Sequence, residues 1–188
     1  TLPRLLEPLR DHPDFQLVTR DTTATVSRAR RLLEERRVSG ALLVPTDLEV
    51  TPLQEDPLAG HRPDGVDCPS AAFGPEGGGF EVQTGVCNYG AFDHPVGVDL
   101  QAGDSIAISI WHDTLDAPEP ATGHVAVWLG AQVVWEETVQ VPSPSAAYDA
   151  VIVLDEPVPA DAPLGLHLHN HGFNSWRFLH IELVEDGP

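Results

Sequence analysis

From residue 80 onward, the sequence is built from short stretches in which apolar and polar residues alternate. Six of these stretches are DSIAISIWHD, GHVAVWLG, QVVWEETVQV, AYDAVIVLDE, LGLHLHNHG and WRFLHIELVE. A period of two is typical of half-buried β-strands, and turn residues separate the stretches at intervals of roughly 10–15 residues. Prolines fall between the stretches, where a missing N–H does not interrupt a strand ladder. The pattern predicts an antiparallel β-sandwich or jelly roll over residues 80–188.

The first 50 residues follow a different pattern, in which helical and strand periods alternate. Leucines recur at helical spacing in TLPRLLEPLRDH, and RDTTATVSRARRLLEERR predicts a second helix. Short apolar runs, FQLVT and ALLVPT, predict strands beside it. Residues 51–79 are rich in Pro, Gly and Asp, which indicates an irregular connection. We therefore expect an α+β chain, with a small α/β segment (1–50), a connection (51–79) and the β-sandwich domain (80–188).

The charge of the chain restricts its partners. The formal net charge is −19, and of the ten basic residues, all arginines, only Arg177 lies beyond residue 62. Nucleic-acid and anionic-membrane binding need a basic surface, so these partners are excluded. No apolar run reaches the roughly 20 residues that span a bilayer, so we expect no transmembrane segment.

Two cysteines, Cys68 and Cys87, are the only ones in the chain. They enclose a Gly-rich loop, and no zinc-type cysteine pattern competes for them, so we expect a disulfide. A disulfide favours an oxidising compartment, which predicts a periplasmic, secreted or cell-surface protein. Two free buried thiols are the alternative.

Three histidines alternate in HLHNH, namely His167, His169 and His171. Residues two apart on a strand share a face, so an i, i+2 pair can reach one ion through bonds of about 2.0–2.1 Å. His112 and His124, each near a strand end beside a loop, are the candidates for a third ligand. Imidazole ligands suit zinc and copper. The sequence therefore predicts a Zn or Cu site built on this strand.

Other roles remain open for these histidines. His112 alternates in phase with three isoleucines of its own strand, which indicates that it faces the core, whereas His167 alternates out of phase with leucines. His61 lies outside the β region and is expected at the surface. A strand-end histidine also commonly bonds a backbone carbonyl or faces solvent, so a structural role competes with the metal hypothesis.

The aromatic residues suggest a second function, in which no metal takes part. Aromatic rings beside amides can hold a sugar by stacking and polar contacts. The residues that could form such a surface are Tyr89, Asn170, Asn174 and Trp176. The same face could hold a partner subunit of a larger assembly. Burial of the tryptophans in the core is the competing interpretation.

Motifs of catalysis are missing from the sequence. It contains no G-x-S-x-G, H-E-x-x-H, P-loop or G-x-G-x-x-G. We therefore expect a binding module rather than an enzyme, with a metal ion as the first candidate ligand and a glycan or protein as the alternative.

Overall fold

The computed structural model describes residues 16–18, 38–169 and 172–184. The strands are β1 (Gln16–Val18), β2 (Val38–Ala41), β3 (Glu49–Val50), β4 (Phe73–Glu76), β5 (Gly79–Gln83), β6 (Tyr89–Pro95), β7 (Ser105–His112), β8 (Ala121–Leu129), β9 (Gln132–Val141), β10 (Ala146–Val153), β11 (Pro163–His169) and β12 (Ser175–Val184). Two short 3₁₀ helices, η2 (Ala59–His61) and η3 (Ser70–Ala72), lie in the connection before β4.

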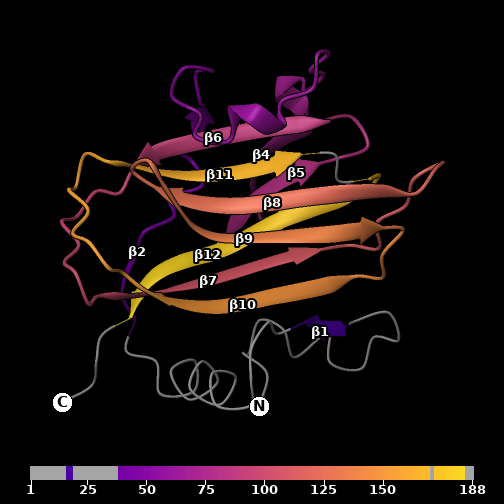
Figure 1. Cartoon of the computed structure of the whole chain (residues 1–188). Coiled ribbons are helices and arrows are strands. Elements are labelled where there is room, and N and C mark those ends of the chain that lie inside the picture. The colour runs from indigo at the N-terminus through magenta and orange to yellow at the C-terminus, as the bar shows by residue number, and fades with distance from the viewer. Residues whose placement is uncertain (1–15, 19–37, 170–171, 185–188) are drawn as a thin grey trace.

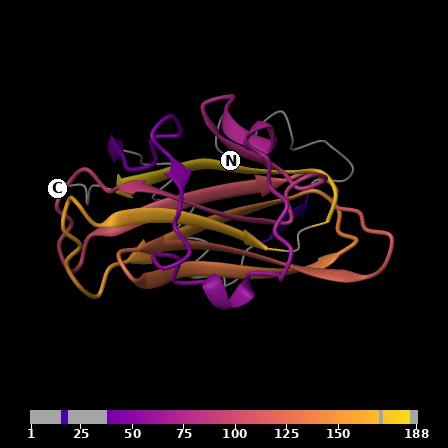
Figure 2. The same ribbon diagram turned by 90° about the horizontal axis from the view of Figure 1, so that it is seen from above.

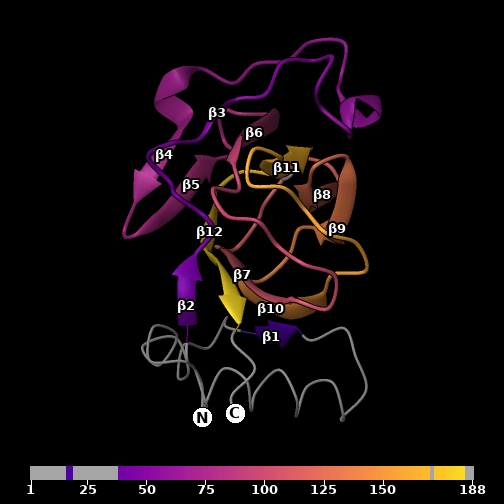
Figure 3. The ribbon, with the colours of Figure 1, turned by 90° about the vertical axis from the view of Figure 1, so that its left-hand side faces the viewer.

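The described strands form two sheets that face each other (Figure 1, Figure 3). We name them sheet A, with seven strands in the order β1-β10-β7-β12-β5-β4 and β2 also paired to β12, and sheet B, with five strands in the order β3-β6-β11-β8-β9. Neighbouring strands are antiparallel except β1 and β10, which are parallel. The predicted antiparallel β-sandwich is confirmed.

The core fills the space between the two sheets. Figure 2 shows the sheets from above as two stacked layers. Every second residue of a strand points into this space, as the alternation of the sequence predicts. On β11 the inward residues are Leu164, Leu166 and Leu168, all fully buried. Trp176 and Phe178 of β12 belong to the same core cluster. The remaining residues of β11, among them His167 and His169, therefore point to the outer face of sheet B.

The connection between the N-terminal part and β5 is fastened to the sandwich by a disulfide. Cys68 and Cys87 are bonded, with their Cα atoms 4.0 Å apart, so the predicted pairing is confirmed. Closing a loop of this length contributes on the order of 3 kcal/mol by restricting the unfolded chain. The bond ties the segment before η3 to the start of β6.

The N-terminal part contributes to the sandwich where it is described. β1 pairs with β10 and β2 pairs with β12, so both extend sheet A. The two helices expected before residue 38 lie outside the described residues. The domain limits at residues 50 and 80 remain a prediction.

Candidate metal centre

The outer face of sheet B carries the histidines of β11. His167 and His169 alternate with the core leucines, and so share the outer face, as the sequence predicts. β8 pairs with β11 so that His169 stands opposite His124. β6 places Ala91 opposite His167, and Tyr89 opposite His169. Three adjacent strands thus bring three histidines, His124, His167 and His169, together with Tyr89 on one surface.

The segment of residues 51–62 packs on this same face. Its start is held by a backbone bond of 2.9 Å from the Thr51 N–H to the carbonyl oxygen of Ala91. The Tyr89 hydroxyl donates to the buried carboxylate of Asp56, whose other oxygen accepts the N–H of Leu58 at 2.8 Å. Burial and the Asp56 carboxylate raise the pKa of Tyr89, so its hydroxyl keeps the proton that it donates. These contacts fix the 3₁₀ turn η2 over sheet B.

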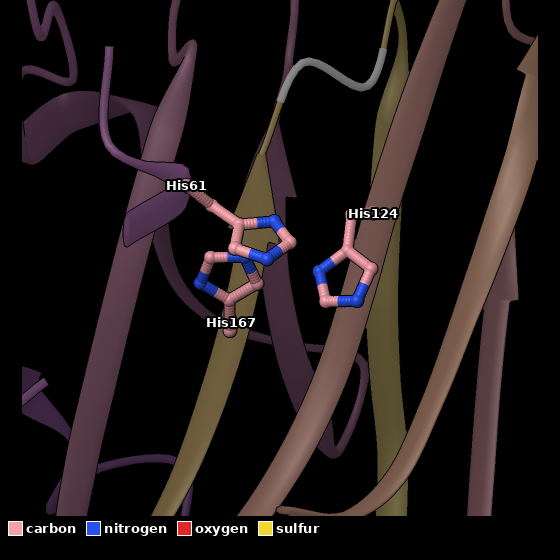
Figure 4. Close-up of side chains that lie close together, drawn as sticks. All are labelled: His61, His124 and His167. Carbon is pink, nitrogen blue, oxygen red and sulfur yellow. The ribbon is translucent and has the colours of Figure 1, made fainter. Parts of the chain in front are cut away.

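At the end of η2, His61 reaches the histidines of the sheet (Figure 4). Its ring centroid lies 4.3 Å from that of His124 and 5.4 Å from that of His167. One ligand nitrogen from each of the three lies within 4.8 Å of the other two. His61 comes from the connection, His124 from β8 and His167 from β11, so the cluster joins three separate pieces of chain.

His124 has the hydrogen bonding of a metal-ligating histidine. Its Nε2 lies 3.0 Å from Oε2 of Glu136 on β9, so Nε2 carries the proton and donates to the carboxylate. The other nitrogen, Nδ1, is buried and has no hydrogen-bond partner among the described residues. In Figure 4 a ring nitrogen of His124 points toward His61 and His167. The carboxylate thus fixes the tautomer that leaves the lone pair of Nδ1 inside the cluster.

The dimensions and protonation of the cluster suit a transition-metal ion. Two nitrogens bound tetrahedrally to zinc at 2.0–2.1 Å lie about 3.4 Å apart, so small side-chain rotations would close the triad on one ion. Partial desolvation of its ring against the sheet, followed by the neighbouring His124, lowers the pKa of His61 below 6.5. A neutral imidazole is the form that ligates, so the environment favours binding at neutral pH.

The structure brings together only part of the ligand set expected from sequence. His124 and His167 join the cluster, but the third member is His61, for which the sequence predicts a surface position and no role. His61 is indeed exposed, and it reaches the cluster only because the connection packs on sheet B. No local pattern around His61 signals this contact, which depends on tertiary packing.

His112 does not reach the cluster, which corrects the expectation that it could serve as a third ligand. It lies on β7 of sheet A, faces the core and is fully buried. Its Nδ1–H donates to the carbonyl oxygen of Asp113 at 2.7 Å, and its Nε2 accepts the Tyr148 hydroxyl at 3.1 Å. With both ring nitrogens bonded, His112 is a structural residue.

His169 lies beside the cluster but is not one of its three members. Its ring centroid is 5.8 Å from that of His61 and 6.2 Å from that of Tyr89. Burial, followed by the neighbouring His61 and His124, lowers its pKa below 6.5. The i, i+2 pair predicted from the sequence is thus replaced by a pair across adjacent strands. His171 and Asn170 lie outside the described residues.

Of the residues proposed for a glycan surface, two are buried. Trp176 is fully buried between the sheets, and Tyr89 is buried under residues 51–62. Neither ring is open to a sugar. Asn174 is used structurally, because its side-chain amide donates to the carbonyl oxygen of Thr114 at 2.9 Å and its own carbonyl accepts from Thr84.

A separate cavity of about 330 Å³ is lined by four connecting segments, namely the one around Asp67 and the loops between β5 and β6, β7 and β8, and β11 and β12. Phe173, which is 50% exposed, lines it from the loop after β11. Asp67 and Asn88 line it near the disulfide. The Asn88 side chain is engaged with the backbone of Asp67 and Gly65, so it stiffens the wall of the cavity.

Comparisons with known proteins give a fold-level likeness. No family model and no curated protein matches the chain. Among solved structures, a CBM4 carbohydrate-binding module is 14% identical, with 76% of this chain and 99% of that chain covered and a TM-score of 0.41. The second N-terminal cellulose-binding domain of β-1,4-glucanase C from Cellulomonas fimi is 17% identical, with 59% and 78% covered and a TM-score of 0.35.

A family 16 carbohydrate-binding module is 13% identical, with 57% of this chain and 76% of that chain covered and a TM-score of 0.36. At these identities and TM-scores the likeness supports no functional inference, and the function has to be argued from the residues. Among the described residues, no helix has the length and apolar character needed to cross a membrane.

Proposed function

We propose that this protein is an extracytoplasmic β-sandwich binding module that holds one Zn²⁺ or Cu²⁺ ion through His61, His124 and His167. The observation that carries the proposal is the convergence of one nitrogen from each histidine within 4.8 Å. The buried lone pair of His124, set by the bond from Nε2 to Glu136, supports it independently. Imidazole nitrogens favour zinc and copper over the hard cations that oxygen ligands bind.

The disulfide supports the location. Cys68–Cys87 persists only where thiols are not kept reduced, as outside the cytoplasm. The high negative charge adds a general attraction for cations, although it does not choose among them.

Thermal unfolding with and without added zinc tests the proposal. At a hundredfold excess of free metal over the dissociation constant, binding stabilises the folded state by about 2.7 kcal/mol. His61→Ala is the sharpest variant, because His61 is exposed and its loss leaves the core intact. We expect this variant to melt near the metal-free parent and to lose the zinc-dependent rise in Tm.

His180→Ala, on β12 of sheet A, is the matched control and should keep the full rise. An unchanged rise in His61→Ala would contradict the proposed centre. His124→Gln provides a second test, since it removes the buried lone pair while retaining a polar side chain of similar length.

Glycan binding is the second candidate function, and one observation favours it. The half-exposed ring of Phe173 and the carboxylate of Asp67 both line the loop-end cavity, where the ring could stack on a sugar and the carboxylate could accept its hydroxyl protons. The acidic surface would repel anionic glycans, so a neutral polysaccharide is the expected ligand.

Affinity electrophoresis through gels containing soluble neutral polysaccharides tests this candidate. The parent should be retarded in at least one gel, and Phe173→Ala should migrate as in a gel without polysaccharide. If the parent migrates freely in all of the gels, or if Phe173→Ala is retarded equally, the cavity is not a glycan site.

A further inference from the structure

We infer that an ion in the proposed centre keeps one coordination position free of protein ligands and takes a small exogenous donor there, such as water or a monodentate anion. The inference rests on the proposed metal function and deepens it. It assigns the centre to the open type of site, in which a ligand from solution completes the coordination, rather than to the closed structural type.

In the described structure, three side chains are placed to bind the ion. Zinc prefers four ligands, and structural sites supply all of them from Cys, His or carboxylate side chains. Of the described residues, the only ones whose ligand atoms meet within 4.8 Å of one another are His61, His124 and His167. Both cysteines are consumed by the disulfide, so no thiolate can complete the set.

The neighbouring carboxylates are committed to other partners. Glu136 bonds Nε2 of His124, the nitrogen on the side of the ring away from the cluster, and so orients a ligand instead of being one. Asp56 is held by the Tyr89 hydroxyl and the N–H of Leu58. Replacing either of these contacts by a metal bond would leave a buried donor unsatisfied, which costs about 1–3 kcal/mol.

The three histidines differ in their exposure to solvent. His167 is fully buried, whereas His61 is exposed. We therefore expect a small donor to approach an ion in the triad from the side of His61.

His169 is the described residue nearest to becoming a fourth protein ligand. Its ring lies at the edge of the cluster, 5.8 Å from that of His61, and it could swing in as a fourth ligand. In the described conformation it stays outside the group of converging nitrogens. We therefore place it outside the set of ligands.

Visible absorption of the Co²⁺-loaded protein tests the inference, because the bands of cobalt report each change in its ligands. Azide is the probe, and sodium perchlorate at equal ionic strength is the non-coordinating control. We expect azide to change the cobalt spectrum in a saturable way with one azide per cobalt, and perchlorate to leave it unchanged. The spectrum of His169→Ala should respond to azide as well, because His169 is not a ligand.

Two results would overturn the open position. A parent spectrum that ignores azide, with a response appearing only in His169→Ala, would show that His169 closes the site. A spectrum that ignores azide in both proteins would show that another group does so. A failure of metal binding itself would give a different result from a closed coordination position. The parent would then show no more cobalt absorption than His61→Ala, which would contradict both the metal function and the open position.

Discussion

At the scale of single residues, Gly165 decides where the Trp128 ring can lie. A Cβ atom at position 165 would come within 1.9 Å of the Trp128 ring, so the indole lies directly on the glycine in the strand next to it. Trp128 is fully buried there and packs with Tyr89 and Ala91 in a small cluster outside the main core. Only the absence of a side chain on β11 leaves room for this arrangement.

Gly165→Ala is therefore expected to destabilise the protein by about 1–3 kcal/mol or more, the usual cost of overpacking a filled site. Urea unfolding measures it. Gly65→Ala is the control, because nothing lies within 4 Å of a Cβ there, and it should stay within about 0.5 kcal/mol of the parent. Equal stabilities for the two variants would show that Trp128 does not lie on Gly165.

The buried His112 makes stability depend on pH. Burial lowers its pKa below 6.5 in the folded state, opposed by its bond to Asp113, while Tyr148 is the other titratable group that it contacts. Above pH 6.5 the ring is neutral in both states and stability is unaffected. Below pH 6.5 the unfolded chain takes up a proton that the folded chain refuses, so stability falls by up to about 1.4 kcal/mol per pH unit.

Unfolding free energies of the metal-free protein between pH 8 and pH 5 measure this effect. His61 and His169 have lowered pKa values too and add to the same slope. Below pH 6.5, the unfolding free energy of His112→Gln should therefore depend less steeply on pH than that of the parent. The difference corresponds to the uptake of about one proton on unfolding. A variant with the full slope of the parent would place the titration elsewhere.

The sequence predicts which face of the sheet a side chain occupies where alternation along one strand is sufficient to determine it. His167 was placed on the face opposite the core leucines, and the conflict of phase with His112 was visible in the isoleucines of β7. His61 could not be found in this way. Its position is fixed by how residues 51–62 cross the sheet, and the sequence of that segment carries no period that encodes the crossing.

At the scale of elements, the segment of residues 51–62 matters most, because it supplies His61 and covers sheet B. The Tyr89–Asp56 bond holds its middle, and the Arg62 guanidinium lies 5.3 Å from the centre of the Tyr89 ring. Composition predicts an irregular connection over residues 51–79, and the segment of residues 51–62 contains the short 3₁₀ helix η2. Its attachment depends on buried polar contacts between residues 33 positions apart, which no local pattern reveals.

Tyr89→Phe is expected to loosen this segment while the sandwich stays folded. The change removes the donor to the buried Asp56 carboxylate, which costs about 1–3 kcal/mol. Hydrogen exchange should rise in residues 51–62 and remain unchanged in β7. Thr46→Val, which removes only an exposed contact to Asp47, is the control and should leave both segments as in the parent. Unaltered exchange in residues 51–62 of Tyr89→Phe would show that the bond does not hold the segment.

At the scale of the whole molecule, the sequence predicted the sandwich and the disulfide but not the order of the strands. Alternation tells which face of a strand is buried, and β7, β8, β9, β10, β11 and β12 each match a stretch identified from it. Sheet order depends on pairings between distant strands, such as β5 with β12, whose energies are spread over many contacts. The histidine cluster includes His167 of β11, a strand that the sequence also singles out, but the convergence of its three members depends on the tertiary fold.

The most direct test of the account is the amount of zinc bound per chain after equilibrium dialysis, measured by elemental analysis on untagged protein. His61→Ala and His169→Ala form the decisive pair, since the two residues neighbour each other in space and only one belongs to the triad. We expect one zinc per chain in the parent and in His169→Ala, and none in His61→Ala. Zinc retained by His61→Ala and lost from His169→Ala would instead favour the i, i+2 pair of β11 and contradict the centre described here.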